Sequence, residues 1–232
     1  MKVKLLRFTA DSELLCGAAA STSIKSGKPS EIFEKMDAET AKHKIRQVTG
    51  YGHASVIEHA SFTFSVEDVS RAMTHQLVRH RVASYTQQSQ RYVTYDTIEK
   101  YVTPPSIVRN AEAKKVFDET LEEISEAYHE LLKMTIPKED ARFILPNAAK
   151  TNIMVTMNAR ELRHFFNLRC CARAQWEIRE VATEMLKQAK KAAPALFENS
   201  GPSCVELGYC PEGKMKPSEC SVSKIKAKFR SL

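Results

Sequence analysis

Residues 79–92 read RHRVASYTQQSQRY, a polar run between two segments with regular apolar spacing. Arg79, His80 and Arg81 place three cationic or titratable side chains in succession, and hydroxyl and amide side chains follow up to Arg91. Arginine forms bidentate, charge-assisted bonds with phosphate, and glutamine can donate to and accept from a base edge at once. The stretch therefore favours a ligand such as a nucleotide. The alternative is a solvated loop after a helix, where cations interact well with the helix dipole.

The composition is that of a globular protein with a core of its own. The chain has 232 residues, of which 43% are hydrophobic and 27% charged, so its length suits one large domain or two small ones. No apolar run is long enough to span a membrane, and the N-terminal residues lack the apolar core of a signal peptide. We therefore expect a cytoplasmic protein with no membrane partner.

The net charge of +7 is concentrated at the C-terminal end. Residues 213–232 contain six Lys or Arg and one Glu, a net of +5, which leaves +2 for the other 212 residues. Such a tail is typical of a disordered, solubilising end, although it could also contact nucleic acid. Cys204, Cys210 and Cys220 lie in or near it without a C-x2-C pair, so we expect no metal and no disulfide.

Hydrophobic spacing predicts the main elements in the first two thirds of the chain. Strict alternation over residues 61–67 predicts a strand. Helical spacing then predicts a helix that opens at Glu67-Asp68 and carries Gln76 as a polar residue on its apolar face. The segment 110–134 predicts a long amphipathic helix with no catalytic constellation, which we interpret as scaffold or a subunit-packing face.

The last third begins with a strand over residues 152–157, followed directly by a helix. Asn158 is an effective N-cap, and Glu161 at the third helical position completes a capping box. Apolar spacing from Ile178 to Ala189 predicts the last core helix. There is no Gly-x-Gly-x-x-Gly turn and no Walker loop, so any flavin or nucleotide must be held chiefly by side chains.

The polar run and four further motifs together resemble one family. Arg79-His80-Arg81, seven residues and Ser89 are similar to the signature of the flavin-dependent thymidylate synthases. The other motifs follow in the family's order, and the resemblance covers about residues 1–196. They are Gly52-His53-Ala54-Ser55 with Glu58-His59, Ala141-Arg142 with Leu145-Pro146, Asn158-Ala159-Arg160 with His164, and Asn167-Leu168-Arg169 with Ala174-Gln175-Trp176-Glu177-Ile178-Arg179.

The resemblance implies an α+β fold, a mixed or antiparallel sheet flanked by helices. It implies a single catalytic domain over residues 1–200, with 201–232 as a cysteine-containing basic C-terminal tail. The implied activity is the reductive methylation of dUMP to dTMP, with 5,10-methylenetetrahydrofolate as carbon donor, NADPH as reductant and FAD as redox carrier. The implied assembly is a homotetramer whose sites are shared between subunits. The alternative function is a basic nucleic-acid-binding protein.

The resemblance also implies roles for individual residues. Arg169 is the implied catalytic residue, a fixed cation that stabilises negative charge on the uracil ring while C5 becomes nucleophilic. The implied flavin-binding residues are Ser55, Arg79, His80, Arg81, Gln87, Asn158, Arg160 and His164. The implied dUMP-binding residues are Gln76, Arg79, Gln87, Gln88, Ser89, Gln90, Arg91, Arg142 and Arg169.

Some positions depart from the family pattern or allow a second interpretation. Ser21 stands where an arginine is usual, and Gln87 stands where a glutamate is common. Ser89 could be a nucleophile, but a serine nucleophile needs an adjacent base, so we interpret it as a nucleotide-binding hydroxyl. Glu58 and His59 are interpreted as part of a buried, hydrogen-bonded network that supports the site.

Overall fold

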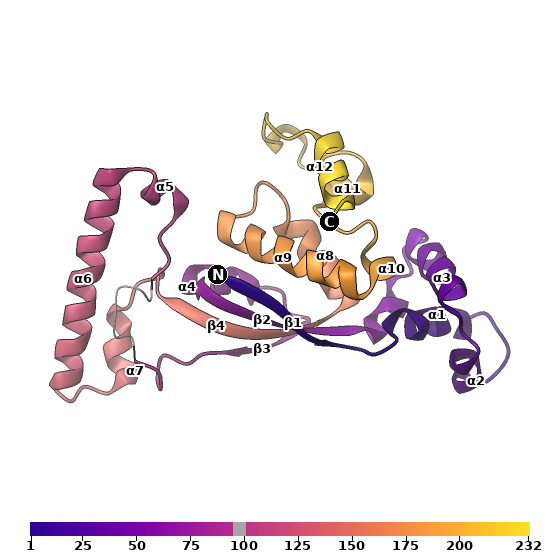
Figure 1. The fold of residues 1–232 in the computed structure, drawn as a ribbon, viewed down its shortest axis with the longest axis horizontal. Helices are drawn as coiled ribbons and strands as arrows, with labels where there is room; N and C mark the ends of the chain where they lie inside the picture. The colour runs from indigo at the N-terminus through magenta and orange to yellow at the C-terminus, as the bar shows by residue number, and fades with distance from the viewer. Residues whose placement is uncertain (95–100) are drawn as a thin grey trace. The chain divides into compact units, whose positions relative to one another are not determined.

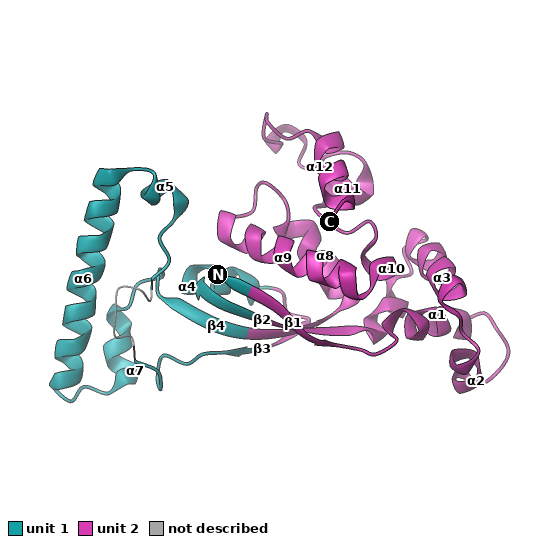
Figure 2. Cartoon of the chain, viewed as in Figure 1, with its two compact units in different colours: residues 1–2, 66–79, 86–153 teal, residues 3–65, 80–85, 154–232 magenta. Residues whose placement is uncertain are grey.

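A computed structural model describes residues 1–94 and 101–232, and the chain divides into two compact units (Figure 2). Unit 1 comprises residues 1–2, 66–79 and 86–153, and unit 2 comprises residues 3–65, 80–85 and 154–232. The chain passes between the units five times, four times within a strand and once between residues 79 and 80, so neither unit is one continuous segment. The residues expected to bind ligands are divided between the two units.

The fold is α+β, as predicted, with one four-stranded antiparallel sheet (Figure 1). The hydrogen-bonded order is β1-β2-β4-β3, so the second and fourth strands along the chain are central. Buried and more exposed side chains alternate along β4, as expected of a strand with one face on a core. The strands are β1 (Lys2–Phe8), β2 (Ser61–Ser70), β3 (Ala83–Gln87) and β4 (Lys150–Asn158).

Strand β2 is longer than predicted, and the helix after it begins later. The expected helix start at Glu67-Asp68 is wrong, because the strand continues to Ser70 and α4 spans Arg71–Leu77. Asp68 has a φ of 55°, a left-handed conformation that aspartate tolerates better than most residues. Its backbone N–H donates to Oδ1 of Asn152 at 3.0 Å. The true cap is Ser70, whose hydroxyl accepts from the N–H of Met73 at 3.0 Å.

Unit 2 is built around aromatic side chains from the sheet and its helices. The ring of Phe197 packs edge-on against Phe62 at 5.2 Å and against Phe166 at 6.0 Å between centroids. Gln188 ties the last long helix to β1, because its side chain accepts from the N–H of Leu5 and donates to a carbonyl of the same strand. The helices of unit 2 are α1 (Ser12–Thr22), α2 (Pro29–Glu34), α3 (Ala38–Gly50), η1 (Ala54–His59), α8 (Ala159–Arg169), α9 (Trp176–Ala192), α10 (Pro194–Phe197), α11 (Ser203–Leu207), η4 (Gly213–Met215) and α12 (Val222–Arg230).

The basic C-terminal segment is folded, which contradicts the expectation of a disordered end. Residues 222–230 form α12, and its Phe229 is only 4% exposed. A methyl group added at Gly201 would lie 3.1 Å from the Phe229 ring, so the backbone and the ring are in close contact. The lysines of α12 suggested a solvated tail because their charge dominates its composition, whereas one apolar residue anchors the helix.

Unit 1 contains a small core on one side of a long helix. Leu121 and Tyr128 are the buried residues of that helix, α6, and they cluster with Tyr101. Further apolar side chains of α6 pack partly buried against this cluster, whereas Val116 is 65% exposed. The predicted helix over 110–134 is thus confirmed, with Asn110 as its cap. The helices of unit 1 are α4, α5 (Pro105–Val108), α6 (Ala111–Lys133), α7 (Lys138–Ala141) and η3 (Arg142–Ile144).

None of the helices in the described ranges is both long enough and apolar enough to cross a bilayer. The longest, α6, has 23 residues but carries many charged side chains. Its amphipathic character fits packing against protein better than burial in lipid.

Candidate active site

His80 is the centre of the group of predicted ligand-binding residues in unit 2. Its side chain is buried, with 5% of the residue exposed. Nε of Arg169 donates to its Nε2 at 3.1 Å, and its Nδ1 lies 3.4 Å from Oε1 of Glu161. The ring packs edge-on against Phe165, with 4.9 Å between centroids, and the Tyr85 hydroxyl donates to the His80 carbonyl at 2.9 Å. The imidazole is therefore held in position from several sides.

The surroundings of His80 keep its imidazole neutral. Burial, which is the largest cause, and the neighbouring Arg169 and His164 together lower its pKa to about 4. Because Nε2 accepts from Arg169, the single ring proton belongs on Nδ1, which faces Glu161. Burial also raises the pKa of the Glu161 carboxyl, while His164 opposes that rise. A chain of polar contacts thus runs from Glu161 through His80 to Arg169.

Helix α8 places several of these groups on one element. Asn158 begins the helix as predicted, because its Oδ1 accepts from the N–H of Glu161 at 2.9 Å. The Glu161 carboxylate, however, lies against His80 rather than completing the expected capping box. Arg169 is the last residue of the same helix, and burial lowers the pKa of its guanidinium. One helix therefore carries the residues at both ends of the chain of contacts.

The remaining predicted flavin-binding residues of unit 2 are exposed. Ser55, Arg81 and His164 all lie at the surface. Arg160 is engaged with Glu58, since its Nη1 lies 2.5 Å from Oε1. This position corrects the interpretation of Glu58 and its neighbour His59 as a buried network, because both are exposed.

In unit 1, the two arginines expected to bind the dUMP phosphate both contact Glu139. Nε of Arg91 donates to Oε2 of Glu139 at 2.7 Å, and its Nη2 lies 2.6 Å from the same oxygen. Arg142 donates from Nε to the backbone carbonyl of Glu139 at 3.1 Å. The Ser89 hydroxyl accepts from the N–H of Arg91 at 3.2 Å. Two arginines therefore meet at Glu139, one at its carboxylate and one at its backbone carbonyl, and sequence reasoning had not singled out this residue.

The predicted amide side chains of unit 1 are partly engaged within the fold. Nε2 of Gln87 donates to the hydroxyls of Thr74 at 3.0 Å and Thr151 at 3.3 Å, both of which are buried. Oε1 of Gln88 accepts from Asn152 at 3.1 Å. An amide at position 87 can satisfy these hydroxyls, so the departure from glutamate leaves no buried polar group unpaired. The others differ in exposure: Gln76 is half-buried, Gln90 is buried and Arg79 is exposed.

Arg169 also reaches a pocket of about 280 Å³ within unit 2. Cys171, Cys204 and Cys210 line the same pocket. Burial raises the pKa of the Cys204 thiol, and the nearby thiols add to that rise. Across residues 1–94 and 101–232, no three His, Cys, Asp or Glu side chains are grouped as metal ligands would be.

The burial of Ser21 offers a physical reason why this chain has no arginine at position 21. It lies in α1, and none of its surface is exposed. An arginine there would bring a charge into the core of unit 2, which is costly without a partner.

Sequence reasoning missed Glu139 and undervalued Glu161. Glu161 occupies a capping-box position, so its local role was a sufficient explanation of the residue. Glu139 lies near the predicted Arg142 motif, yet nothing in its spacing reveals a partner 48 residues away. Both are carboxylates that hold a predicted functional side chain in place.

A family model described as thymidylate synthase complementing protein matches residues 4–195. This chain belongs to that family. The match covers all the motifs quoted above and ends before the basic C-terminal segment.

Full-length relatives agree with the family assignment. The flavin-dependent thymidylate synthase of Geobacter sulfurreducens is 47% identical over 234 residues, covering 100% of this chain and 99% of that protein. The flavin-dependent thymidylate synthase of Pyrococcus abyssi is 50% identical over 197 residues, covering 82% of this chain and 81% of that protein. These relatives confirm the prediction of a flavin-dependent thymidylate synthase over the alternative of a nucleic-acid-binding protein.

Solved structures show the same fold. The Helicobacter pylori flavin-dependent thymidylate synthase, complexed with FAD and dUMP, superimposes with a TM-score of 0.70 at 24% identity. That match covers 87% of this chain and 100% of the other. The UMP/dUMP methylase PolB of Streptomyces cacaoi, bound to 5-Br dUMP, gives a TM-score of 0.71 at 26% identity, covering 85% of this chain and 93% of that one.

Proposed function

We propose that this protein is a flavin-dependent thymidylate synthase that converts dUMP to dTMP with bound FAD. We assign that activity because the chain belongs to the thymidylate synthase complementing protein family. The single structural observation that carries the assignment is the contact between Arg169 and the buried, neutral His80. It holds one guanidinium at a fixed orientation, as charge stabilisation on a pyrimidine ring requires.

Arg169 acts on the uracil ring. A neutral imidazole accepts from its Nε, so the plane of the guanidinium is set before the substrate arrives. Preorganised donors need no rearrangement when charge develops, and that saving lowers the barrier. The delocalised cation stabilises negative charge spread over the carbonyl oxygens and N3, which raises electron density at C5. Arg169 is therefore a catalytic residue in this proposal.

The protein side chains that we assign to FAD suit a dinucleotide with a diphosphate. Arg79 and Arg81 are exposed and make no ion pair or side-chain hydrogen bond within residues 1–94 and 101–232, so both can bind an anion. Arg160 can exchange its exposed partner Glu58 for a ligand oxygen. Bound FAD supplies the hydride chemistry. The other groups assigned to it are Ser55, His80, Gln87, Asn158 and His164.

The protein side chains that we assign to dUMP suit a phosphate monoester. Arg91 and Arg142 both contact Glu139, and Ser89 lies beside Arg91. A phosphate dianion can replace the exposed Glu139 carboxylate and accept from Arg91 in its place. The backbone near Ser89 and the amides of Gln76, Gln87, Gln88 and Gln90 remain our proposed contacts for the base and sugar.

The carbon donor, the reductant and the assembly are part of the same proposal. We assign 5,10-methylenetetrahydrofolate as carbon donor and NADPH as reductant. The exposed Val116 of α6 is available for a contact between subunits, and we assign a homotetramer whose subunits share their sites. Six free cysteines accord with a reducing, cytoplasmic environment.

One spectral experiment tests the function. The protein is loaded with FAD, and its visible spectrum is recorded before and after saturation with dUMP. We expect a dUMP-dependent change in the flavin bands and dTMP formation once methylenetetrahydrofolate and NADPH are added. An unchanged spectrum together with no dTMP would contradict the assignment.

A further inference from the structure

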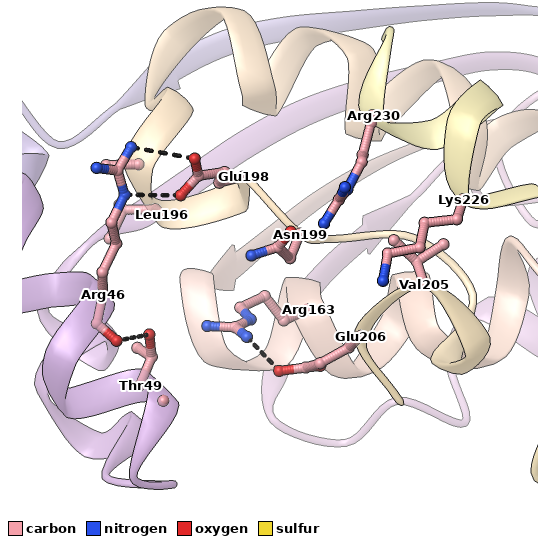
Figure 3. A pocket seen from close by; sticks show the side chains of 12 residues that line it. Arg46, Thr49, Arg163, Leu196, Glu198, Asn199, Val205, Glu206, Lys226 and Arg230 are labelled. Atoms are coloured by element: carbon pink, nitrogen blue, oxygen red, sulfur yellow. Dashed lines mark hydrogen bonds and ion pairs between the residues drawn. The ribbon is translucent and has the colours of Figure 1, made fainter. Parts of the chain in front are cut away.

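A basic pocket in unit 2 is lined by none of the residues assigned above to FAD or dUMP. Its volume is about 370 Å³. Four cationic side chains line it: Arg46 from α3, Arg163 from α8, and Lys226 and Arg230 from α12. Figure 3 shows them around a common space, with Asn199 between them. Elements far apart in the sequence therefore bring like charges together.

Two of the four cations are neutralised by carboxylates. Arg46 binds Glu198 through two bonds, from Nε at 2.8 Å and from Nη2 at 3.0 Å. Nη2 of Arg163 donates to Oε1 of Glu206 at 2.7 Å. The same two carboxylates line the pocket (Figure 3), so its lining has four positive and two negative groups.

The other two cations lack such partners. Lys226 and Arg230 make no ion pair and no side-chain hydrogen bond with any of the described residues. Both lie on α12, which is anchored by the buried Phe229. Like charges that face one space repel each other, and the two carboxylates in the pocket lining are already paired with Arg46 and Arg163. The pocket lining therefore has an excess of two positive charges, which a bound anion could neutralise.

We propose that this pocket binds a small molecule carrying a phosphoryl dianion. A dianion matches the excess charge, and lysine and arginine are the usual side-chain donors to phosphate. The volume lies in the range of small-molecule pockets, about 300 to 1,000 Å³, and exceeds the need of a lone phosphate. Leu196 and Val205 give the pocket apolar wall for the organic part of a phosphate ester. Bound there, the anion joins α12 to α3 and α8.

The test is a calorimetric titration of the FAD-loaded protein, saturated with dUMP, with inorganic pyrophosphate. Saturation with dUMP keeps the probe out of the nucleotide site. We expect saturable binding and about tenfold weaker binding in Lys226→Gln, because one charge-assisted bond is lost. Arg230→Gln should weaken binding to a similar degree. The matched control is Lys224→Gln, on the same helix but exposed and outside the pocket lining, with binding within twofold of the parent.

Two further titrations identify the ligand class. Ribose 5-phosphate should bind at least as well as inorganic phosphate if the apolar wall contacts the organic part. Binding of inorganic phosphate alone would overturn the assignment to an ester. No saturable binding of any probe, or equal weakening in Lys224→Gln and Lys226→Gln, would overturn the site itself. Since the pocket shares no residue with the proposed active site, the dTMP assay on the same variants tests the enzyme separately.

Discussion

The two groups of ligand-binding residues, one in each compact unit, are held in opposite ways. In unit 2 the imidazole of His80 is buried and bonded to Arg169, and its other nitrogen faces Glu161. In unit 1 the guanidinium of Arg91 is exposed and paired with Glu139. The first group is fixed within the fold, whereas the second is held by a contact that water and ions can exchange.

The difference matches the two tasks that the proposal gives them. A side chain that stabilises charge on a reacting ring gains from an orientation set in advance. A side chain that binds phosphate can exchange a weakly held partner for the ligand. An exposed carboxylate is such a partner, because an exposed ion pair contributes little free energy. Four predictions test this contrast, and their expected effects become progressively smaller.

The largest effect is expected at Arg169. Arg169→Lys keeps a point charge but loses the planar fork and the Nε bond to His80. We expect dTMP formation to fall roughly a hundredfold or more, the scale seen when one preorganised donor is removed. NADPH-driven flavin reduction should remain close to that of the parent. The measurement pairs anaerobic flavin reduction with dTMP yield on one preparation, and equal losses in both would make Arg169 a general binding residue.

The second effect concerns pH and His80. Its folded pKa of about 4 lies below the usual value near 6.5, so the unfolded state takes up the proton first as the pH falls. The neutral ring therefore contributes stability above pH 6.5, and that contribution is lost as the pH falls toward 4. The parent should lose about 2 kcal/mol of unfolding free energy through His80 between pH 7 and pH 5.

Urea unfolding at the two pH values measures this effect in the parent and in His80→Gln. The variant lacks the titrating ring, so its unfolding free energy should fall less with acid than that of the parent. His43→Gln, an exposed histidine of α3, is the control and should behave as the parent. An equal pH dependence in all three proteins would show that His80 is not held neutral by folding.

A third, smaller effect is expected at Ser89. Ser89→Ala removes a hydroxyl beside Arg91 but no charge. We expect dUMP binding to weaken about fivefold, the value of one hydrogen bond, with dTMP formation still measurable. A flavin-monitored dUMP titration supplies the affinity, and Ser106→Ala, at an exposed position of α5, is the control. Trapping of a uracil adduct on Ser89 would instead give it a covalent role.

The smallest effect has the opposite sign. Glu139→Gln removes the carboxylate that competes with phosphate for Arg91. Exposed ion pairs contribute roughly 0.2 to 1 kcal/mol, so dUMP should bind about twofold to threefold more tightly. Glu130→Gln breaks an exposed pair with Lys133 on α6 and should leave dUMP affinity unchanged. Weaker binding in Glu139→Gln would mean that Glu139 positions Arg91 for the ligand, and the contrast between the units would then fail.

The sequence predicted elements well wherever the cause is local. The Asn158 cap, the strand before it and the amphipathic helix over 110–134 depend on neighbours in the chain, and all three are confirmed. The end of β2 was predicted wrongly because Asp68 is held by the side chain of Asn152, 84 residues away. A carboxylate pair at Glu67-Asp68 looks like a helix start when that distant partner is unknown.

In the candidate site, too, the sequence predicted local features better than contacts between distant residues. Motif positions identified His80 and Arg169 through the family resemblance, but no motif shows that the two are bonded to each other across 89 residues. The sequence also failed to predict the exposure of two side chains: Glu58 and His59 were expected to be buried and are exposed. The individual roles of the ligand-binding residues stay predictions until the variants are measured.

The anchoring of α12 by Phe229 has a consequence for the order in which the protein is made. Translation proceeds from the N-terminus, so Phe229 leaves the ribosome after the residues of unit 2 that its ring contacts, including Gly201. Until then, the nascent chain exposes the apolar surface that this ring covers. Unit 2 therefore reaches its final packing only after nearly all of residues 1–232 have been synthesised, and premature termination before residue 229 leaves a chain with an unfilled core position.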